Sequence, residues 1–195
     1  MISYPFFRHV ILAAAVLLGC AAVSNVGGPS PGYSGAPGEA TCSASGCHGK
    51  ANADNQHKGK MALRIGDDLT AYKPGQSYSL TVKLADPAQD GRMGFLVTAL
   101  TDRQVAAGKF KSLNGEVSIT SEDIGGSKRF YARHTTEGNR PSIPKAKAWT
   151  LNWTAPPAGS GPVTLYAAGV CGNGNLQADA EDHTYTSKLV LQEAP

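Results

Sequence analysis

The sequence of 195 residues lacks the signatures of the common hydrolases. It contains no catalytic triad or carboxylate pair in a recognisable frame, no phosphate-binding glycine loop and no zinc-protease motif. We therefore expect a protein that is not an enzyme.

The sequence also has only a small excess of positive over negative charge. The formal net charge is +3 at pH 7, and it falls to +2 without Arg8, the only Lys, Arg, Asp or Glu among the first 24 residues. A field this weak does not favour binding to a polyanion. DNA and RNA are therefore excluded as partners.

Long apolar runs are limited to one, at the N-terminus. Residues 10–18 are too few to span a bilayer, which takes about 20 apolar residues. They follow the single Arg8 and precede small residues, which is the layout of a signal peptide. The sequence therefore predicts a signal peptide over residues 1–24 and an exported mature protein.

Cys20 has two interpretations. Leu17, Leu18, Gly19 and Cys20 resemble a lipobox, in which cleavage precedes an acylated cysteine that anchors the protein to a membrane surface. The alternative is ordinary cleavage after Ser24, with Cys20 discarded. Both stay open, and in either case the following residues, 25–40, contain GGPSPGYSGAPGE and are predicted to form a flexible linker that packs little.

Long amphipathic helices and internal repeats are also missing, whereas 23 Gly and 12 Pro favour turns and short strands. Alternating apolar residues at 78, 80, 82 and 84 predict a strand with one buried face. Further strands are predicted at 94–100, 116–120, 129–134, 148–154, 162–168 and 184–191. This spacing predicts an all-β fold, an immunoglobulin-like antiparallel β-sandwich over residues 67–195, with Trp149, Leu151 and Trp153 in its core.

Residues 41–66 carry the chemistry. In TCSASGCHG, Cys42 and Cys47 are separated by four residues and His48 follows directly. One covalent haem c would use both cysteines as thioethers and His48 as an iron ligand. The usual spacing has two residues between the cysteines, and Gly46 would permit the longer loop to bulge.

Two other interpretations of this motif remain. An exported pair of cysteines commonly forms a disulfide, here Cys42–Cys47, although that leaves His48 without a role. A zinc site is the weakest alternative, because the neighbours Cys47 and His48 would reach one tetrahedral ion only under strain. The haem signature is preferred because it accounts for all three residues.

A family resemblance rests on the runs SGAPGEATCSASGCHG, YKPGQSYSLTVKL, GFLVTAL, YARHTTEG, WTLNWTAPPAGSGPVTLYAAG and GNGN. These resemble bacterial exported proteins with a Reeler-like domain, also called the choice-of-anchor V family, over nearly all of the mature chain. The resemblance implies a reelin-type β-sandwich at a cell surface, often preceded by a Cys, Cys, His haem signature. It implies fold and location more than activity.

His134 matches the His-Thr pair of that family and lies at the end of a predicted strand. It is either the second axial ligand of the iron or a buried histidine bonded to a turn. His57 and His183 lie in polar stretches and are expected to be solvated. Met61 and Met93 are candidate sulfur ligands, but methionines among strands more often fill a core.

Two further features have plain interpretations. Cys171 is left over once the other cysteines are assigned, and it is expected to be a small buried residue. Lys50, Lys58 and Lys60 form a basic cluster near His48, interpreted as a solvated loop or, alternatively, as a face for an acidic redox partner protein.

Two hypotheses of function follow. The first is an exported, membrane-tethered monohaem c-type cytochrome-like protein for electron transfer or redox sensing, in the periplasm or at the cell surface. The second is a non-enzymatic surface adhesion or binding module in which Cys42 and Cys47 form a disulfide.

Overall fold

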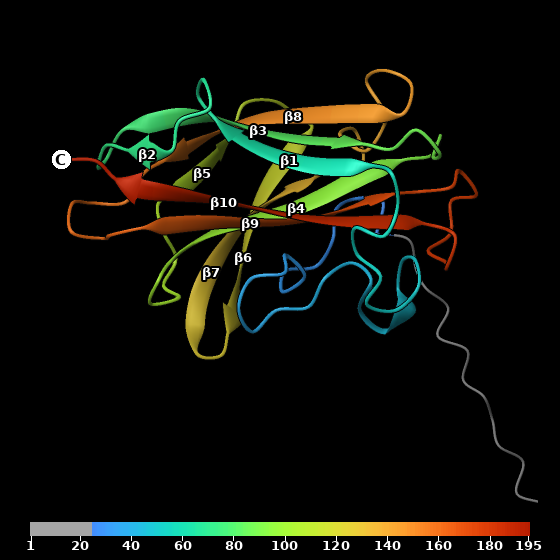
Figure 1. The fold of residues 1–195 in the computed structure, drawn as a ribbon, viewed down its shortest axis with the longest axis horizontal. Helices are drawn as coiled ribbons and strands as arrows, with labels where there is room; N and C mark the ends of the chain where they lie inside the picture. Colours follow the sequence, from blue (N-terminus) through green and yellow to red (C-terminus); the bar gives the residue numbers. More distant parts are fainter. Residues whose placement is uncertain (1–24) are drawn as a thin grey trace, which may run out of the picture.

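The computed structural model describes residues 25–195, which form two packed β-sheets (Figure 1). The ten strands are β1 (Lys60–Ile65), β2 (Ala71–Tyr72), β3 (Ser77–Ala85), β4 (Met93–Thr101), β5 (Lys109–Ser112), β6 (Val117–Ile124), β7 (Ser127–His134), β8 (Ala146–Thr154), β9 (Val163–Cys171) and β10 (His183–Glu193).

One sheet has four strands in the order β1-β3-β8-β5, and the other has six in the order β2-β10-β9-β4-β7-β6. The pairings are antiparallel except that β2 pairs parallel to β10 through two residues. The predicted all-β sandwich is therefore confirmed.

The core lies between the sheets and is centred on two tryptophans of β8. Trp149 and Trp153 are fully buried, and each indole N–H is satisfied, by the carbonyls of Gly138 at 2.6 Å and Ala107 at 3.0 Å respectively. The ring of Phe95 packs on Trp149 with 4.6 Å between centroids. A buried indole needs such a hydrogen-bond partner, so the alternation predicted for 148–154 places these side chains in the core as expected.

Three of the strands, β1, β2 and β5, are not predicted from the sequence. Strand β1 pairs with β3 from Lys60↔Ala85 to Ile65↔Leu80, so residues 60–65 belong to the sandwich although the sequence analysis places them in the attachment segment. Strands β2 and β5 have two and four residues, too few to produce a readable period of two.

Residues 25–40 differ from the linker expected there, because they pack along β7. Glu39 pairs with Arg129, with the closest atoms 2.6 Å apart, and also accepts a hydrogen bond from the Tyr131 hydroxyl. The Arg133 side chain donates to the carbonyl of Pro29 at 2.8 Å. The physical reason is that this segment supplies hydrogen-bond and charge partners to side chains of β7, which a composition rich in Gly and Pro does not reveal.

Candidate functional site

One cavity of about 280 Å³ lies at one end of the six-stranded sheet, where the neighbouring strands β9 and β7 end and β4, between them, begins. Its walls come from four parts of the chain: the N-terminal segment, the Cys, Cys, His motif, the strand ends and the loop after β9. Apolar surface predominates over polar surface in its lining. A mostly apolar cavity with a few placed polar groups is the ordinary form of a ligand or cofactor site.

The three motif residues Cys42, Cys47 and His48 all line this cavity. Between the cysteines the chain makes the 3-10 turn η1 (Ala44–Gly46), in which Gly46 has φ 72°. The His48 N–H donates to the carbonyl of Cys42 at 3.1 Å, so the loop closes on itself. The long spacing is thus absorbed by one tight turn that keeps the motif together.

The two cysteines of the motif differ in their surroundings. Cys42 is buried, Cys47 is exposed, and within residues 25–195 neither takes part in a disulfide. Burial raises the pKa of the Cys42 thiol to about 12, and the negative charge of Asp54 adds to the effect. Both sulfurs are free to bond a group held in the cavity.

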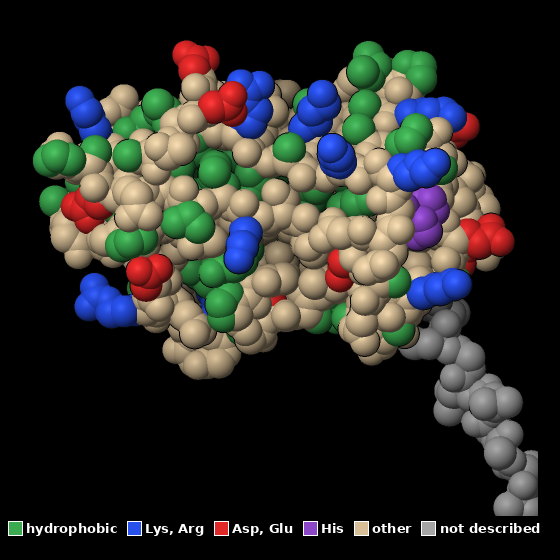
Figure 2. All heavy atoms as spheres, in the orientation of Figure 1, with side chains coloured by type: hydrophobic (Ala, Val, Ile, Leu, Met, Phe, Trp, Pro, Cys, Tyr) green, Lys and Arg blue, Asp and Glu red, His purple; other side chains and the backbone are tan. Residues whose placement is uncertain are grey.

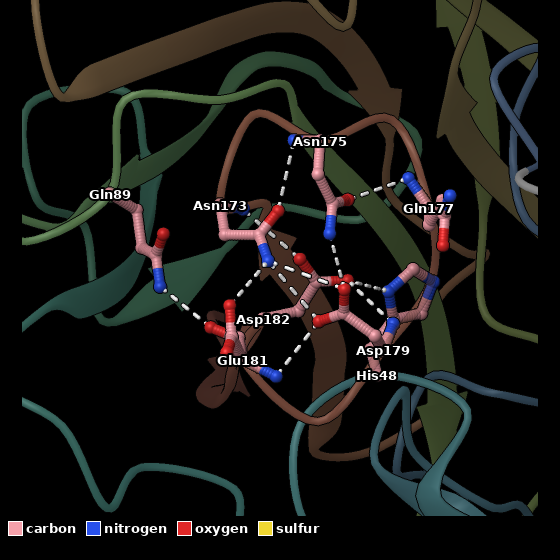
Figure 3. A network of polar contacts seen from close by, with 8 residues as sticks. All are labelled: His48, Gln89, Asn173, Asn175, Gln177, Asp179, Glu181 and Asp182. Atoms are coloured by element: carbon pink, nitrogen blue, oxygen red, sulfur yellow. Dashed lines mark hydrogen bonds and ion pairs between the residues drawn. The ribbon is translucent and has the colours of Figure 1, made fainter.

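His48 is oriented by an acidic side chain from the far end of the sequence. Its Nδ1 donates to Oδ2 of Asp182 at 2.6 Å (Figure 3). This bond leaves Nε2 as the ring nitrogen available to a ligand. A carboxylate on the second ring nitrogen is the usual partner of a metal-binding histidine.

His134 lines the same cavity, where its ring lies against Gly94. A Cβ at residue 94 would come within 2.4 Å of the ring carbon Cε1, so only glycine leaves room for this histidine. The N–H of Phe95 donates to Nδ1 of His134 at 3.1 Å. Burial lowers the pKa of His134 to about 4, which keeps the imidazole neutral.

The other histidines lie outside the cavity. His57 is exposed and stacks on His183 with 3.4 Å between ring centroids, while Nδ1 of His183 is hydrogen-bonded to the buried carboxylate of Asp86. Burial alone would raise the pKa of Asp86, but hydrogen bonds from Tyr185, from the N–H of Ala88 and from His183 outweigh it and lower that pKa. His183 is therefore held in a polar network rather than being merely solvated.

The remaining candidates have structural positions. Met61 and Met93 are buried in the hydrophobic core, with Met93 also reaching the cavity lining, and Cys171 is buried, as expected. Lys50, Lys58 and Lys60 are exposed. On the face seen in Figure 2, acidic and basic side chains are interspersed rather than gathered by sign.

Asp182 is the site residue that the sequence analysis does not single out. Its partner His48 lies 134 residues away, and no local spacing connects the two. The only local signal is the polar run between Gly172 and Asp182, which starts with GNGN, one of the runs that carry the family resemblance.

No family model and no curated protein matches the chain. Among solved structures, it is similar to the Reelin-N domain of F-spondin, with 26% identity and a TM-score of 0.45, over 70% of this chain and 87% of that one. The human F-spondin reeler domain is similar at 25% identity and a TM-score of 0.43, over 68% and 89%. A cohesin module from a Clostridium perfringens family 33 glycoside hydrolase shares 12% identity at a TM-score of 0.45, over 69% and 96%.

Neither a bare metal site nor a membrane-spanning helix is found in the described part of the chain. Within residues 25–195 no group of three or more His, Cys, Asp or Glu side chains is arranged to hold a bare metal ion. The same part of the chain has no helix long and apolar enough to cross a membrane. Cys20 and the predicted signal peptide lie outside the described residues.

Proposed function

We propose that this protein is an exported monohaem c-type cytochrome-like protein, which serves in electron transfer or redox sensing rather than catalysis. The observation that carries the proposal is that Cys42, Cys47, His48 and His134 line one cavity. The first three lie in one short segment, but His134 reaches the cavity from the end of β7. A loop that only formed a Cys42–Cys47 disulfide would not require His134 to line the same cavity.

The donor set fits haem c. Two free thiols supply the sulfurs for thioether bonds, and His48 has its Nδ1 occupied by Asp182 and its Nε2 available. The apolar lining excludes water from a bound macrocycle. When bound, the haem supplies one-electron exchange at its iron, and the residues of this chain hold it, orient it and shield it.

The test is covalent attachment. Full-length protein made together with a haem-attachment system should show one added haem mass after denaturation, and a pyridine haemochrome spectrum of c type. The double variant Cys42→Ala, Cys47→Ala should lose all covalent haem. Cys171→Ala is the matched control and should keep it, because Cys171 is buried beside the cavity without lining it.

A contrary result would favour the second hypothesis. If the wild-type protein carries no haem under these conditions and instead contains a Cys42–Cys47 disulfide, the cytochrome-like function is wrong. The protein would then be treated as a non-enzymatic surface module that binds a protein or glycan.

We also propose that Cys20 is the acylated first residue of the mature protein, on the basis of the run Leu17, Leu18, Gly19, Cys20. The wild-type protein should partition with membranes and the Cys20→Ala variant should become soluble, because the acyl chains supply the anchor. Fractionation followed by N-terminal sequencing checks this. An N-terminus at Asn25 in wild-type protein would rule the anchor out.

A further inference from the structure

The loop between β9 and β10 forms one wall of the cavity and ends in Asp182. Figure 3 shows its polar side chains turned inward on one another around Asp179 and Asp182. Asp179 accepts hydrogen bonds from the side chains of Asn173 and Asn175 and from the N–H of Glu181. A loop with this many internal hydrogen bonds holds its last residue in a defined place.

Asp182 itself is bonded at both oxygens. Oδ1 accepts from the N–H of Asn173 at 3.1 Å, and Oδ2 accepts from Nδ1 of His48 at 2.6 Å. Among the described residues, His48 is the side chain that is hydrogen-bonded to the Asp182 carboxylate. The second oxygen is therefore aimed at His48 rather than at a structural arginine or lysine.

The backbone on either side fixes this approach. The N–H of Gly49 donates to the carbonyl of Asp179 at 2.7 Å. A Cβ at Gly49, where φ is 66°, would come within 2.8 Å of the Asp182 carbonyl oxygen. Glycine next to His48 thus allows the motif to dock directly on the acidic loop, and the contact between Asp182 and His48 depends on that docking.

Burial strengthens the electrostatic effect of the Asp182 carboxylate on His48. The Asp182 side chain is 2% exposed and that of His48 is 28% exposed, so the contact is shielded from most of the solvent. A carboxylate bonded to the outer nitrogen of a metal-ligating imidazole makes the imidazole a stronger donor, and negative charge near an iron favours its oxidised form. Such an effect is largest where water is excluded.

On the basis of the haem site proposed above, we infer that Asp182 is the positioning residue of that site. It holds the proton of His48 on Nδ1 and leaves Nε2 for the iron, and its charge lowers the reduction potential. No other residue of the loop is bonded to the His48 side chain in the described part of the chain. The haem-binding motif and the late acidic loop then act as one unit.

The experiment compares reduction potentials of the haem-loaded full chain. Asp182→Asn keeps the shape and an acceptor oxygen but removes the charge, so the variant should keep its covalent haem and show a higher potential. Glu181→Gln is the matched control: it removes an exposed carboxylate from the same loop, one that bonds Asn173 and does not contact His48. Its potential should stay close to that of the wild type.

The outcomes separate the two proposals. Haem present in both variants, with the Asp182→Asn potential equal to that of the wild type, would overturn the role of Asp182 and leave the haem site standing. Absence of haem from the wild type would overturn both. The unmutated ferrous protein gives a check that needs no variant to fold: nitrogen-15 NMR should find a slowly exchanging proton on Nδ1 of His48, and its absence would contradict the inference.

Discussion

Replacing Glu39 with alanine should lower the free energy of unfolding by about 3–5 kcal/mol, because it leaves a buried guanidinium without its partner. The Glu39 and Arg129 side chains are 0% and 4% exposed, and their closest atoms are 2.6 Å apart. Glu39 also accepts from the Tyr131 hydroxyl and from the Ser34 N–H. Urea denaturation followed by tryptophan fluorescence measures the change.

An exposed ion pair provides the control for this prediction. Arg64 and Asp68 form a bidentate contact, but their side chains are 56% and 66% exposed. Asp68→Asn should therefore change the free energy of unfolding by less than about 1 kcal/mol. If Glu39→Ala costs no more than this control, residues 25–40 do not contribute to the folded domain in solution.

Replacing His134 with alanine should convert a low-spin haem spectrum to a high-spin one, if His134 supplies the sixth ligand of the iron. The cavity brings its ring to the Cys, Cys, His motif, and burial lowers its pKa to about 4, so the imidazole is neutral and able to bind a metal. Because Nδ1 accepts a hydrogen bond from the Phe95 N–H at 3.1 Å, the proton of the neutral ring lies on Nε2 in this structure. Ligation through Nε2 would therefore require the proton to move to Nδ1, where the Phe95 carbonyl lies 3.4 Å away as the alternative partner. Absorption and electron paramagnetic resonance spectra check the spin state.

Two control variants sharpen the test of His134. His57→Ala and Met61→Ala should leave the spectrum unchanged, since neither residue lines the cavity. Met61 is part of the hydrophobic core, so its variant is expected to lose stability without losing the low-spin signal. A folded His134→Ala protein that stays low-spin, or a sulfur-to-iron band in the wild type, would make the ligand assignment wrong.

The sequence predicts the sandwich well wherever a strand alternates for long enough. Strand β8 carries Trp149, Leu151 and Trp153 on one buried face, and its pattern is legible without any structure. Strand β1 has the same alternation, with Met61, Leu63 and Ile65 buried, but it follows the motif so closely that the sequence predicts it to be part of the attachment segment. No strand is predicted there because of its position directly after the motif, although its alternation is clear.

Some residues of the candidate site can likewise be predicted from the sequence and others cannot. Cys42, Cys47 and His48 lie within seven residues of one another in the sequence, so their shared chemistry can be inferred from spacing. Asp182 and Glu39 meet their partners, His48 and Arg129, only because the sheet folds distant segments together. Long-range contacts of this kind leave no local pattern, and a single sequence does not show which residues form them.

The packing of residues 25–40 against the sandwich limits the distance between the domain and a membrane to which Cys20 would be anchored. The carbonyl of Val26 already accepts a hydrogen bond from the Asn139 side chain, and Asn25 and Val26 line the cavity. If Cys20 is acylated, the segment that connects it to Asn25 has five Cα–Cα steps, which span at most about 18 Å when fully extended. The cavity, which Asn25 and Val26 line, would then lie close to the bilayer, and a protein that exchanges electrons with the haem would have to reach it at that membrane surface.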